Sequence, residues 1–305
     1  MQNMKGLLLI VSALICTLPI FAEGIVFADS NVKALCVANW DSDSDGELSM
    51  EEAATVTTLG SVFREKNGIV SFGELRYFTG LSMIDSYAFY KSSIETIELP
   101  SSVTRIGDYA FSQSNIAGEL HIPGTVKDIS RYAFYNCKNL TGVVLEEGVQ
   151  TIGYSCFSGP IAMLSLPASL TYIYNMAINP FASGDSSSGI FVPEGDLYVY
   201  AHGTTPAAIN QFAFYYVFGE AHLVVPFGSM EAYKAEPGWS HFGEYLQYGD
   251  VNSDGNVNNR DVISLRSYIL GNNPTPFNVN VADVNGDGTI NNRDVILLRN
   301  SIMNQ

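Results

Sequence analysis

The sequence predicts a multidomain protein in which a solenoid of short β-strands and turns is flanked at each end by a helical segment that contains acidic loops. Two internal duplications predict this fold. From residue 84 onward the chain repeats with a period of 21 to 23 residues, and residues 250–294 contain one twelve-residue acidic loop twice. Repeats of this length are typical of stacked arrays, in which neighbouring units bury one another's apolar faces.

The N-terminal residues predict an export signal. Lys5 provides a short positive region, the apolar run 6–21 follows, and small residues suited to signal peptidase stand at Ala22 and Ala28. We expect a signal peptide within residues 1–28, cleaved after Ala22 or after Ala28. The alternative is a membrane anchor, but the run is short for a span, and no later apolar run of about 18 residues occurs. We therefore expect a mature chain without a membrane span, secreted by a bacterium or held at its surface.

Length, charge and cysteine content narrow the classes of function. The 305 residues suffice for two or three domains. Acidic residues outnumber basic ones 31 to 15, giving a formal net charge of −16, which argues against nucleic acid and anionic lipid as partners. After the export signal, Cys36, Cys137 and Cys156 remain. An odd, widely spaced set predicts buried thiols rather than a disulfide framework.

Each unit of the first duplication carries an isoleucine followed five residues later by a phenylalanine. The aligned residues are Ile84, Ile106, Ile129 and Ile152, with Phe89, Phe111, Phe134 and Phe157. In three units the phenylalanine ends a Tyr-Ala-Phe turn, and short apolar strands such as 94–99 end at a proline. We expect equivalent apolar and aromatic side chains to form ladders, and the prolines to end strand pairing because they lack an N–H donor. The exposed strand face, where a ligand would bind, includes Glu95, Glu98, Glu119 and His121.

These units resemble the BspA-like leucine-rich repeats of bacterial surface proteins. The resemblance lies in the Ile-x-x-x-Ala-Phe turn, the Leu-Pro strand ending and the Leu/Val-x-x-Ile pattern, and it covers residues 67–245. It includes a closing segment, 223–242, whereas residues 179–208 depart from the period and are expected to be an insertion. The resemblance implies a leucine-rich-repeat solenoid that acts in adhesion or protein binding, with an unknown protein ligand on the repeat face.

The second duplication predicts two calcium sites. Loops 250–261 and 283–294 carry oxygen-bearing side chains at positions 1, 3, 5, 9 and 12 and glycine at position 6. Calcium takes about six to eight oxygen ligands, and this spacing supplies them from one turn of chain. An apolar helix is expected after each loop, over 262–270 and 295–303. The predicted ligands, with residues 256 and 289 contributing backbone carbonyls, are Asp250, Asn252, Asp254, Asn256, Asn258, Asp261, Asp283, Asn285, Asp287, Thr289, Asn291 and Asp294.

A third acidic loop, 41–52, fits the EF-hand pattern at every position, with a glutamate at position 12 that can chelate through both oxygens. Short helices over 31–40 and 51–59 would flank it in an EF-hand-like N-terminal segment, 31–66. Calcium is thus the predicted cofactor, at three sites; a solvated acidic turn is the alternative here. The ligands predicted in this loop are Asp41, Asp43, Asp45, Glu47, Ser49 and Glu52.

Residues 248–305 closely resemble a type I dockerin, in which two loop-plus-helix repeats are joined by a linker, here 271–282. The resemblance implies docking onto a cohesin-like domain through loop positions 10 and 11 and the following helix, with either repeat able to face the partner. The matching residues are Asn259, Arg260, Arg266, Ser267, Asn292, Arg293, Arg299 and Asn300. The usual long linker before such a module is missing, because only residues 243–249 intervene, so a calcium-locked cap on the solenoid is the alternative.

No catalytic residue is predicted, and we do not expect an enzyme. The four histidines have no zinc-ligand spacing, the Ser/Gly-rich stretch 184–188 lacks a matching histidine, and no phosphate-binding loop occurs. The leading hypothesis is an exported calcium-binding repeat scaffold for protein–protein interaction or adhesion, tethered through the dockerin-like module to a cohesin-type partner. Two alternatives stay open: purely structural calcium caps on an adhesin, or a non-catalytic or cryptic hydrolase component of a cellulosome-like complex in polysaccharide breakdown.

Overall fold

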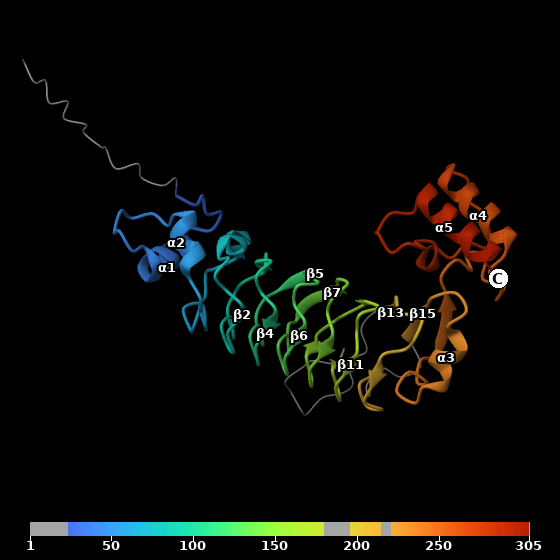
Figure 1. Ribbon diagram of the computed structural model, residues 1–305, viewed down its shortest axis with the longest axis horizontal. Helices are drawn as coiled ribbons and strands as arrows, with labels where there is room; N and C mark the ends of the chain where they lie inside the picture. Colours follow the sequence, from blue (N-terminus) through green and yellow to red (C-terminus); the bar gives the residue numbers. More distant parts are fainter. Residues whose placement is uncertain (1–23, 180–195, 215–220, 305) are drawn as a thin grey trace, which may run out of the picture.

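The computed structural model describes residues 24–179, 196–214 and 221–304. Figure 1 shows an elongated molecule, with helices α1 (Ser30–Trp40) and α2 (Met50–Thr55) at one end, stacked strands in the middle, and helices α4 (Asn259–Ile269) and α5 (Asn292–Met303) at the other end. Most of the predicted export signal lies outside the described residues. Within the described residues, no helix is long and apolar enough to cross a membrane.

Two parallel six-stranded sheets run along the solenoid, with strand orders β16-β15-β13-β10-β7-β5 and β14-β11-β8-β6-β4-β2. We call the first the long-strand sheet and the second the short-strand sheet. The long-strand sheet contains β5 (Ala117–Ile122), β7 (Asn139–Leu145), β10 (Met163–Leu166), β13 (Leu197–Ala201), β15 (Ala221–Val225) and β16 (Glu244–Gln247). The short-strand sheet contains β2 (Met83–Ile84), β4 (Arg105–Ile106), β6 (Asp128–Ile129), β8 (Thr151–Ile152), β11 (Tyr172–Ile173) and β14 (Ala208–Ile209).

Shorter elements complete the coils. Two two-stranded parallel sheets pair β1 (Ser71–Phe72) with β3 (Thr96–Ile97) and β9 (Phe157–Ser158) with β12 (Ile178–Asn179). The remaining elements are the 3₁₀-helices η1 (Gly73–Tyr77) and η2 (Val279–Val281) and the helix α3 (Met230–Ala235). The repeat region is therefore a parallel β-solenoid with few helices.

The predicted ladders of isoleucine and phenylalanine are confirmed. Ile84, Ile106, Ile129 and Ile152 are paired in register along the short-strand sheet. The rings of the aligned phenylalanines stack at centroid distances of 4.9, 5.0 and 5.3 Å, and all four are buried. Each coil thus buries its apolar face against the next one, as a repeat too small for its own core requires.

The tyrosines of the turn form a ladder of their own outside this core. Tyr87, Tyr109 and Tyr132 have left-handed backbone φ angles of 64°, 57° and 58°, and their rings stack at 4.9 and 4.6 Å. A left-handed non-glycine residue costs about 1–2 kcal/mol, which stacking and hydrogen bonds to the next coil, such as Tyr87 N–H to Asp108 O at 3.0 Å, offset. The following alanines are fully buried, because the turn runs against the core there.

Both ends of the solenoid differ from expectation in extent. Helix α2 ends at Thr55 rather than at residue 59, because Val56 is extended (φ −69°, ψ 118°) and the chain then turns to bury Leu59. The predicted insertion 179–208 is wrong in its second part, since Leu197–Ala201 forms β13 between β10 and β15; residues 180–195 lie outside the described residues. Residues 243–249 contain β16, which pairs with β15 as the last strand of the long-strand sheet.

The three predicted thiols are confirmed as buried and free. Burial raises the pKa of Cys137 to about 12, so its thiolate, the reactive form, is scarce at neutral pH.

The segment that precedes α1 belongs to the folded N-terminal end. Ile25 is 3% exposed and donates its N–H to Leu48 O at 2.7 Å, and the ring of Phe27 packs on that of Phe72 at 6.4 Å. Ala28 N–H donates to Glu74 Oε1 at 3.0 Å. These contacts join the start of the described chain to the first coil.

This packing predicts that a chain beginning at Asp29 is less stable than one beginning at Glu23, by about 2–4 kcal/mol, because burial of Ile25 and part of Phe27 is lost. Urea unfolding of the two chains measures the difference. Val26→Ala in the longer chain is the matched control, since Val26 is 88% exposed and its truncation should leave stability unchanged. Equal stability of the two chains would show that the segment contributes nothing.

Candidate functional site

The three acidic loops share one hydrogen-bonding pattern at their first position. The aspartate there accepts a hydrogen bond from the backbone N–H of the glycine at position 6: Asp41 Oδ2 from Gly46 at 3.0 Å, Asp250 Oδ2 from Gly255 at 3.0 Å, and Asp283 Oδ2 from Gly288 at 2.7 Å. The three glycines have φ between 80° and 89°, the left-handed region that side chains disfavour. The loop therefore turns around its first carboxylate.

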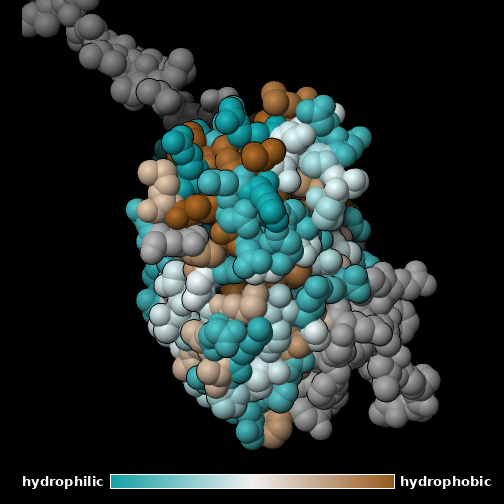
Figure 2. Space-filling model, turned by 90° about the vertical axis from the view of Figure 1, so that its right-hand side faces the viewer, coloured by the Kyte–Doolittle hydropathy of each residue, from teal (hydrophilic) through white to brown (hydrophobic). Residues whose placement is uncertain are grey.

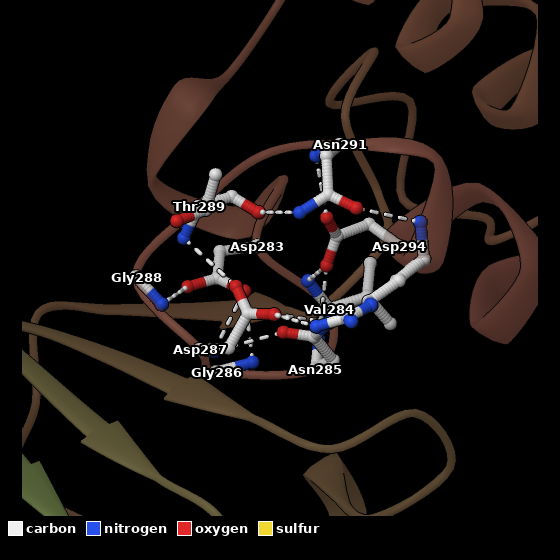
Figure 3. Close-up of polar contacts among 10 residues, drawn as sticks. Asp283, Val284, Asn285, Gly286, Asp287, Gly288, Thr289, Asn291 and Asp294 are labelled. Atoms are coloured by element: carbon white, nitrogen blue, oxygen red, sulfur yellow. Dashed lines mark hydrogen bonds and ion pairs between the residues drawn. The ribbon is translucent and has the colours of Figure 1, made fainter.

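Positions 3 and 5 continue the pattern in each loop. Each side chain at these positions accepts from the backbone N–H two residues further on, at 2.8 to 3.2 Å. Figure 3 shows this arrangement in the last loop, where Asp283, Asn285 and Asp287 point into the turn from consecutive odd positions. The side chains therefore gather oxygen atoms on the inside of each loop.

The carboxylate at position 12 closes each loop and caps the next helix. Asp294 Oδ1 accepts from Val284 N–H at 2.9 Å and Oδ2 from Asn291 N–H at 2.8 Å. Asp261 and Glu52 hold equivalent positions in the other loops. In all three, position 9 is the N-cap and position 12 completes a capping box. The sequence of the loop thus fixes the start of α2, α4 and α5.

The loop carboxylates are buried or lie close together, so a bound cation would offset the loss of hydration and the repulsion between their charges. Asp261 and Asp294 are fully buried. Burial raises the pKa of Asp261, and burial with the neighbouring Asp294 and Asp287 carboxylates raises that of Asp283. In the N-terminal loop, Asp41, Asp43 and Asp45 offer carboxylate oxygens within 4.8 Å of one another. Donor sets of carboxylate, amide and backbone oxygens fit a hard divalent cation such as calcium.

The predicted ligands thus lie in three separate loops, with six predicted ligand residues in each. One predicted side chain points elsewhere: the Glu47 carboxylate pairs with Lys33 Nζ at 2.6 Å, which leaves its backbone carbonyl as the donor expected at position 7.

The predicted partner-binding residues lie on the surface of α4 and α5. Both helices begin three residues before the predicted start, because the capping asparagine stands at position 9, so Asn259, Arg260, Asn292 and Arg293 form the first helical turns. The side chains of Arg260 and Arg293 are 81% and 80% exposed.

Sequence reasoning missed four apolar residues on the same surface. Ile263, Leu270, Ile296 and Met303 are 60–78% exposed. Because residues three, four and seven apart share a helix face, they flank Arg266 on α4 and Arg299 on α5. Figure 2 views this end of the molecule and shows brown apolar atoms among teal ones in its upper part. The sequence contained a signal for these four residues. They occur at equal offsets in both repeats, on the side of the helix opposite the buried Leu265 and Leu298.

The C-terminal module packs directly on the outer face of the long-strand sheet. Val224 and Tyr248 of the solenoid end share one buried cluster with Val251, Leu265 and Leu298 of the module. Tyr198 and Tyr200 of β13 and Phe227 pack against this cluster. The geometry of a cap on the solenoid, which the short connection 243–249 suggested, is therefore present.

The uncovered part of the same sheet face forms a groove of about 460 Å³ beside the module. Its floor includes Glu119, His121, Val144 and Met163. Its wall is formed by the second loop of the C-terminal module, 283–294, with Asp283 and Asp287. Glu119 Oε1 and His121 Nε2 are 2.8 Å apart, and both residues are exposed, as predicted. Glu95 and Glu98 are exposed too, but they lie outside this groove.

The stacked parallel coils and the duplicated loop-plus-helix module define a leucine-rich-repeat protein with a C-terminal docking module. Residues 81–186 match the family model described as BspA type leucine rich repeat region, in six copies, and residues 248–303 match the dockerin type I domain. The chain thus contains a BspA-type repeat region and a type I dockerin domain. No curated protein matches it. Both are non-catalytic modules of protein interaction, typical of extracellular proteins.

The hydrogen bonds of Glu52 predict an acid-dependent N-terminal end. The backbone N–H of Ser49 and the N–H and hydroxyl of Ser42 lower the pKa of Glu52 to about 2, against the opposing effect of burial, from a usual value of 4.5. Since the folded pKa lies below the unfolded one, this stabilisation is complete above pH 4.5 and is lost as pH falls through 2.

In chelator, the protein should therefore melt at a higher temperature than Glu52→Gln at pH 7, and the difference should disappear near pH 2. Glu51→Gln serves as control, because Glu51 is exposed and accepts no hydrogen bond at the cap. A difference that is constant from pH 7 to pH 2 would contradict the assignment.

Proposed function

We propose that this protein is an exported, calcium-dependent scaffold that holds a protein ligand on its repeat face and is tethered through its dockerin domain to a cohesin-like partner. The observation that carries the proposal is the duplicated surface of α4 and α5. Asn-Arg in the first turn and Ile-x-x-Arg in the second recur unchanged, and the side chains of these arginines and isoleucines are exposed in both helices. Exposed apolar residues among arginines are typical of protein interfaces.

Calcium is proposed at three sites, one in each loop. The side-chain oxygens of positions 1, 3, 5 and 12 and a backbone carbonyl at position 7 would hold the ion. The residue at position 9 is the N-cap of the helix that follows. The bound ion supplies positive charge to converging carboxylates; three ions would change the formal net charge from −16 to about −10. Because the N-terminal EF-hand-like loop shares the hydrogen-bonding pattern of the other two loops, we propose that it binds calcium as they do.

The groove on the long-strand sheet is the proposed ligand face of the repeat region. Its volume suits a segment of a protein ligand, and it combines apolar residues such as Val144 and Met163 with the polar Glu119 and His121. Adhesion is the expected role of such a face in a protein displayed outside the cell.

Export is part of the proposal, and the fold favours cleavage after Ala22. Cleavage after Ala28 would remove Ile25 and Phe27 from the core of the N-terminal end, whereas cleavage after Ala22 keeps them. N-terminal sequencing of the secreted protein, beside the stability comparison of the two chains, decides between the sites.

A purely structural role of the calcium loops is the second candidate, because the N-terminal loop and the C-terminal module both pack on the ends of the solenoid. The hydrolase alternative rests on paired carboxylates near residues 179–208, most of which lie outside the described residues, and no observation favours it.

Native mass spectrometry should detect three bound calcium ions, and chelation should lower the melting temperature by several degrees, because carboxylates then repel one another. Asp41→Ala, Asp250→Ala and Asp283→Ala should each remove one ion. The matched control is Asp196→Ala, an exposed aspartate outside the loops, which should keep three. A metal-free protein with an unchanged melting temperature would contradict the calcium proposal.

Binding to type I cohesin domains should survive the loss of either repeat surface but not of both. Ile263→Ala with Arg266→Ala, or Ile296→Ala with Arg299→Ala, should lower affinity by less than about threefold, because the other repeat takes over. All four substitutions together should lower it by about a hundredfold or more. Titration calorimetry in calcium measures both effects.

Met163→Glu is the control for surface specificity, since it alters the groove and leaves α4 and α5 intact. It should keep cohesin binding and lose ligands captured by the repeat face. Failure of every cohesin tested to bind, with calcium bound and melting shifted by chelator, would favour the purely structural role.

A further inference from the structure

The two dockerin repeats differ at several positions, and three of these lie where the second repeat faces the solenoid. Because they are copies within one chain, each serves as the reference for the other. On the proposed partner side, Asn-Arg, Ile and Arg recur at equal offsets, whereas Asn300 replaces Ser267 and Met303 replaces Leu270. On the opposite side, three positions of the first repeat are replaced in the second: Ser253 by Gly286, Ser264 by Leu297 and Tyr268 by Ser301.

The replacement of Ser253 by Gly286 is explained by a close contact with His202, the residue that follows β13. A Cβ atom on Gly286 would lie 3.0 Å from His202 Cε1. His202 has little freedom to move, because its Nε2 lies 2.8 Å from Ser165 Oγ and its ring stacks on Tyr248 at 5.6 Å. Backbone conformation does not require the glycine: Ser253 has φ 54° at the equivalent position, close to the 69° of Gly286. The contact with His202 of the solenoid therefore explains why position 286 has no side chain.

The other two changes fit a small cavity at the same junction. Leu297 and Ser301 line a space of about 150 Å³ together with Phe227 and Tyr248 of the solenoid end. Leu297 supplies an apolar side chain where Ser264 of the first repeat has a hydroxyl. Ser301 leaves room where the first repeat has a tyrosine, Tyr268, whose ring stacks on Phe277 at 4.4 Å.

Further contacts join the module to the end of the long-strand sheet. Asn280, in the linker before the second dockerin loop, lines the groove together with Tyr200 of β13. Gly249 N–H, just after β16, donates to Val281 O at 2.9 Å. Leu298 is 1% exposed and shares a buried cluster with Tyr248. The contacts of His202, Phe227 and Tyr248 thus fall on the second dockerin loop and on the inner side of α5.

We infer that the second dockerin repeat carries a docking surface for the solenoid of its own chain, and that the ion of the second loop, not of the first, controls this docking. The docking surface consists of Gly286, Leu297, Leu298 and Ser301. It lies opposite the partner surface, so the partner surface would be held in one orientation relative to the groove. The calcium part of this inference rests on the proposed function.

The test compares full-length proteins in which the repeats exchange their distinguishing residues. Gly286→Ser with Leu297→Ser gives the second repeat the residues of the first. The matched control, Ser253→Gly with Ser264→Leu, makes the reverse exchange in the first repeat. Spin labels at Lys138→Cys on the solenoid and Asn272→Cys in the module, both exposed positions, report the distance between the two parts.

In calcium, the unchanged protein and the control should give one narrow distance distribution, and the docking variant a broad one. Far-UV circular dichroism and calcium titration on the same samples show whether each variant is folded and loaded. A narrow distribution in a folded, loaded docking variant would overturn the docking surface. A broad distribution in the unchanged protein would overturn it as well.

Asp250→Ala and Asp283→Ala, on the same labelled chain, test which ion controls docking. Asp283→Ala should broaden the distribution, and Asp250→Ala should leave it narrow. Equal effects of both, or none of Asp283→Ala, would overturn the assignment to the second loop. If the protein binds no calcium at all, the proposed function fails, while the exchange variants still decide whether the docking surface exists.

Discussion

Mutual burial between successive coils is the constraint on which this structure depends. A coil of about 23 residues cannot enclose its own apolar side chains, so Phe111 is covered by Phe89 on one side and Phe134 on the other. Such a stack is stable only if its two ends are closed. The N-terminal helices close one end around Val32 and Cys36, and the last coil closes the other with α3 and the fully buried Trp239.

In each acidic loop, the residue at position 12 serves both the folding of the loop and the proposed binding of the metal. The carboxylate at position 12 caps its own helix and accepts loop N–H groups, so it holds the loop closed around the same oxygens that would bind calcium. This double use explains why the loop and the helix that follows it recur together as one unit. It also places the loop residues Asn259 and Asn292 in the first turn of a helix, where their side chains face outward.

The junction between repeat region and dockerin domain gives the molecule its functional geometry. Because β16 leads directly into the first loop, little chain is left to act as a flexible tether. The module covers the end of the long-strand sheet and leaves Glu119, His121 and Met163 uncovered as the floor of a groove. The inner side of α5 is consequently turned to the solenoid, whereas the surface with Ile263 and Ile296 stays exposed.

The sequence alone determined what depends on spacing. Ile84 and Phe89 recur with the period of the coil, and Asp250 and Asp283 begin loops whose oxygen positions are set within twelve residues, so ladders and loops were predictable. Tertiary structure decided that residues 197–201 form a strand and that Gly286 lies against His202. Those outcomes depend on contacts between residues far apart in the chain, which local periodicity does not encode.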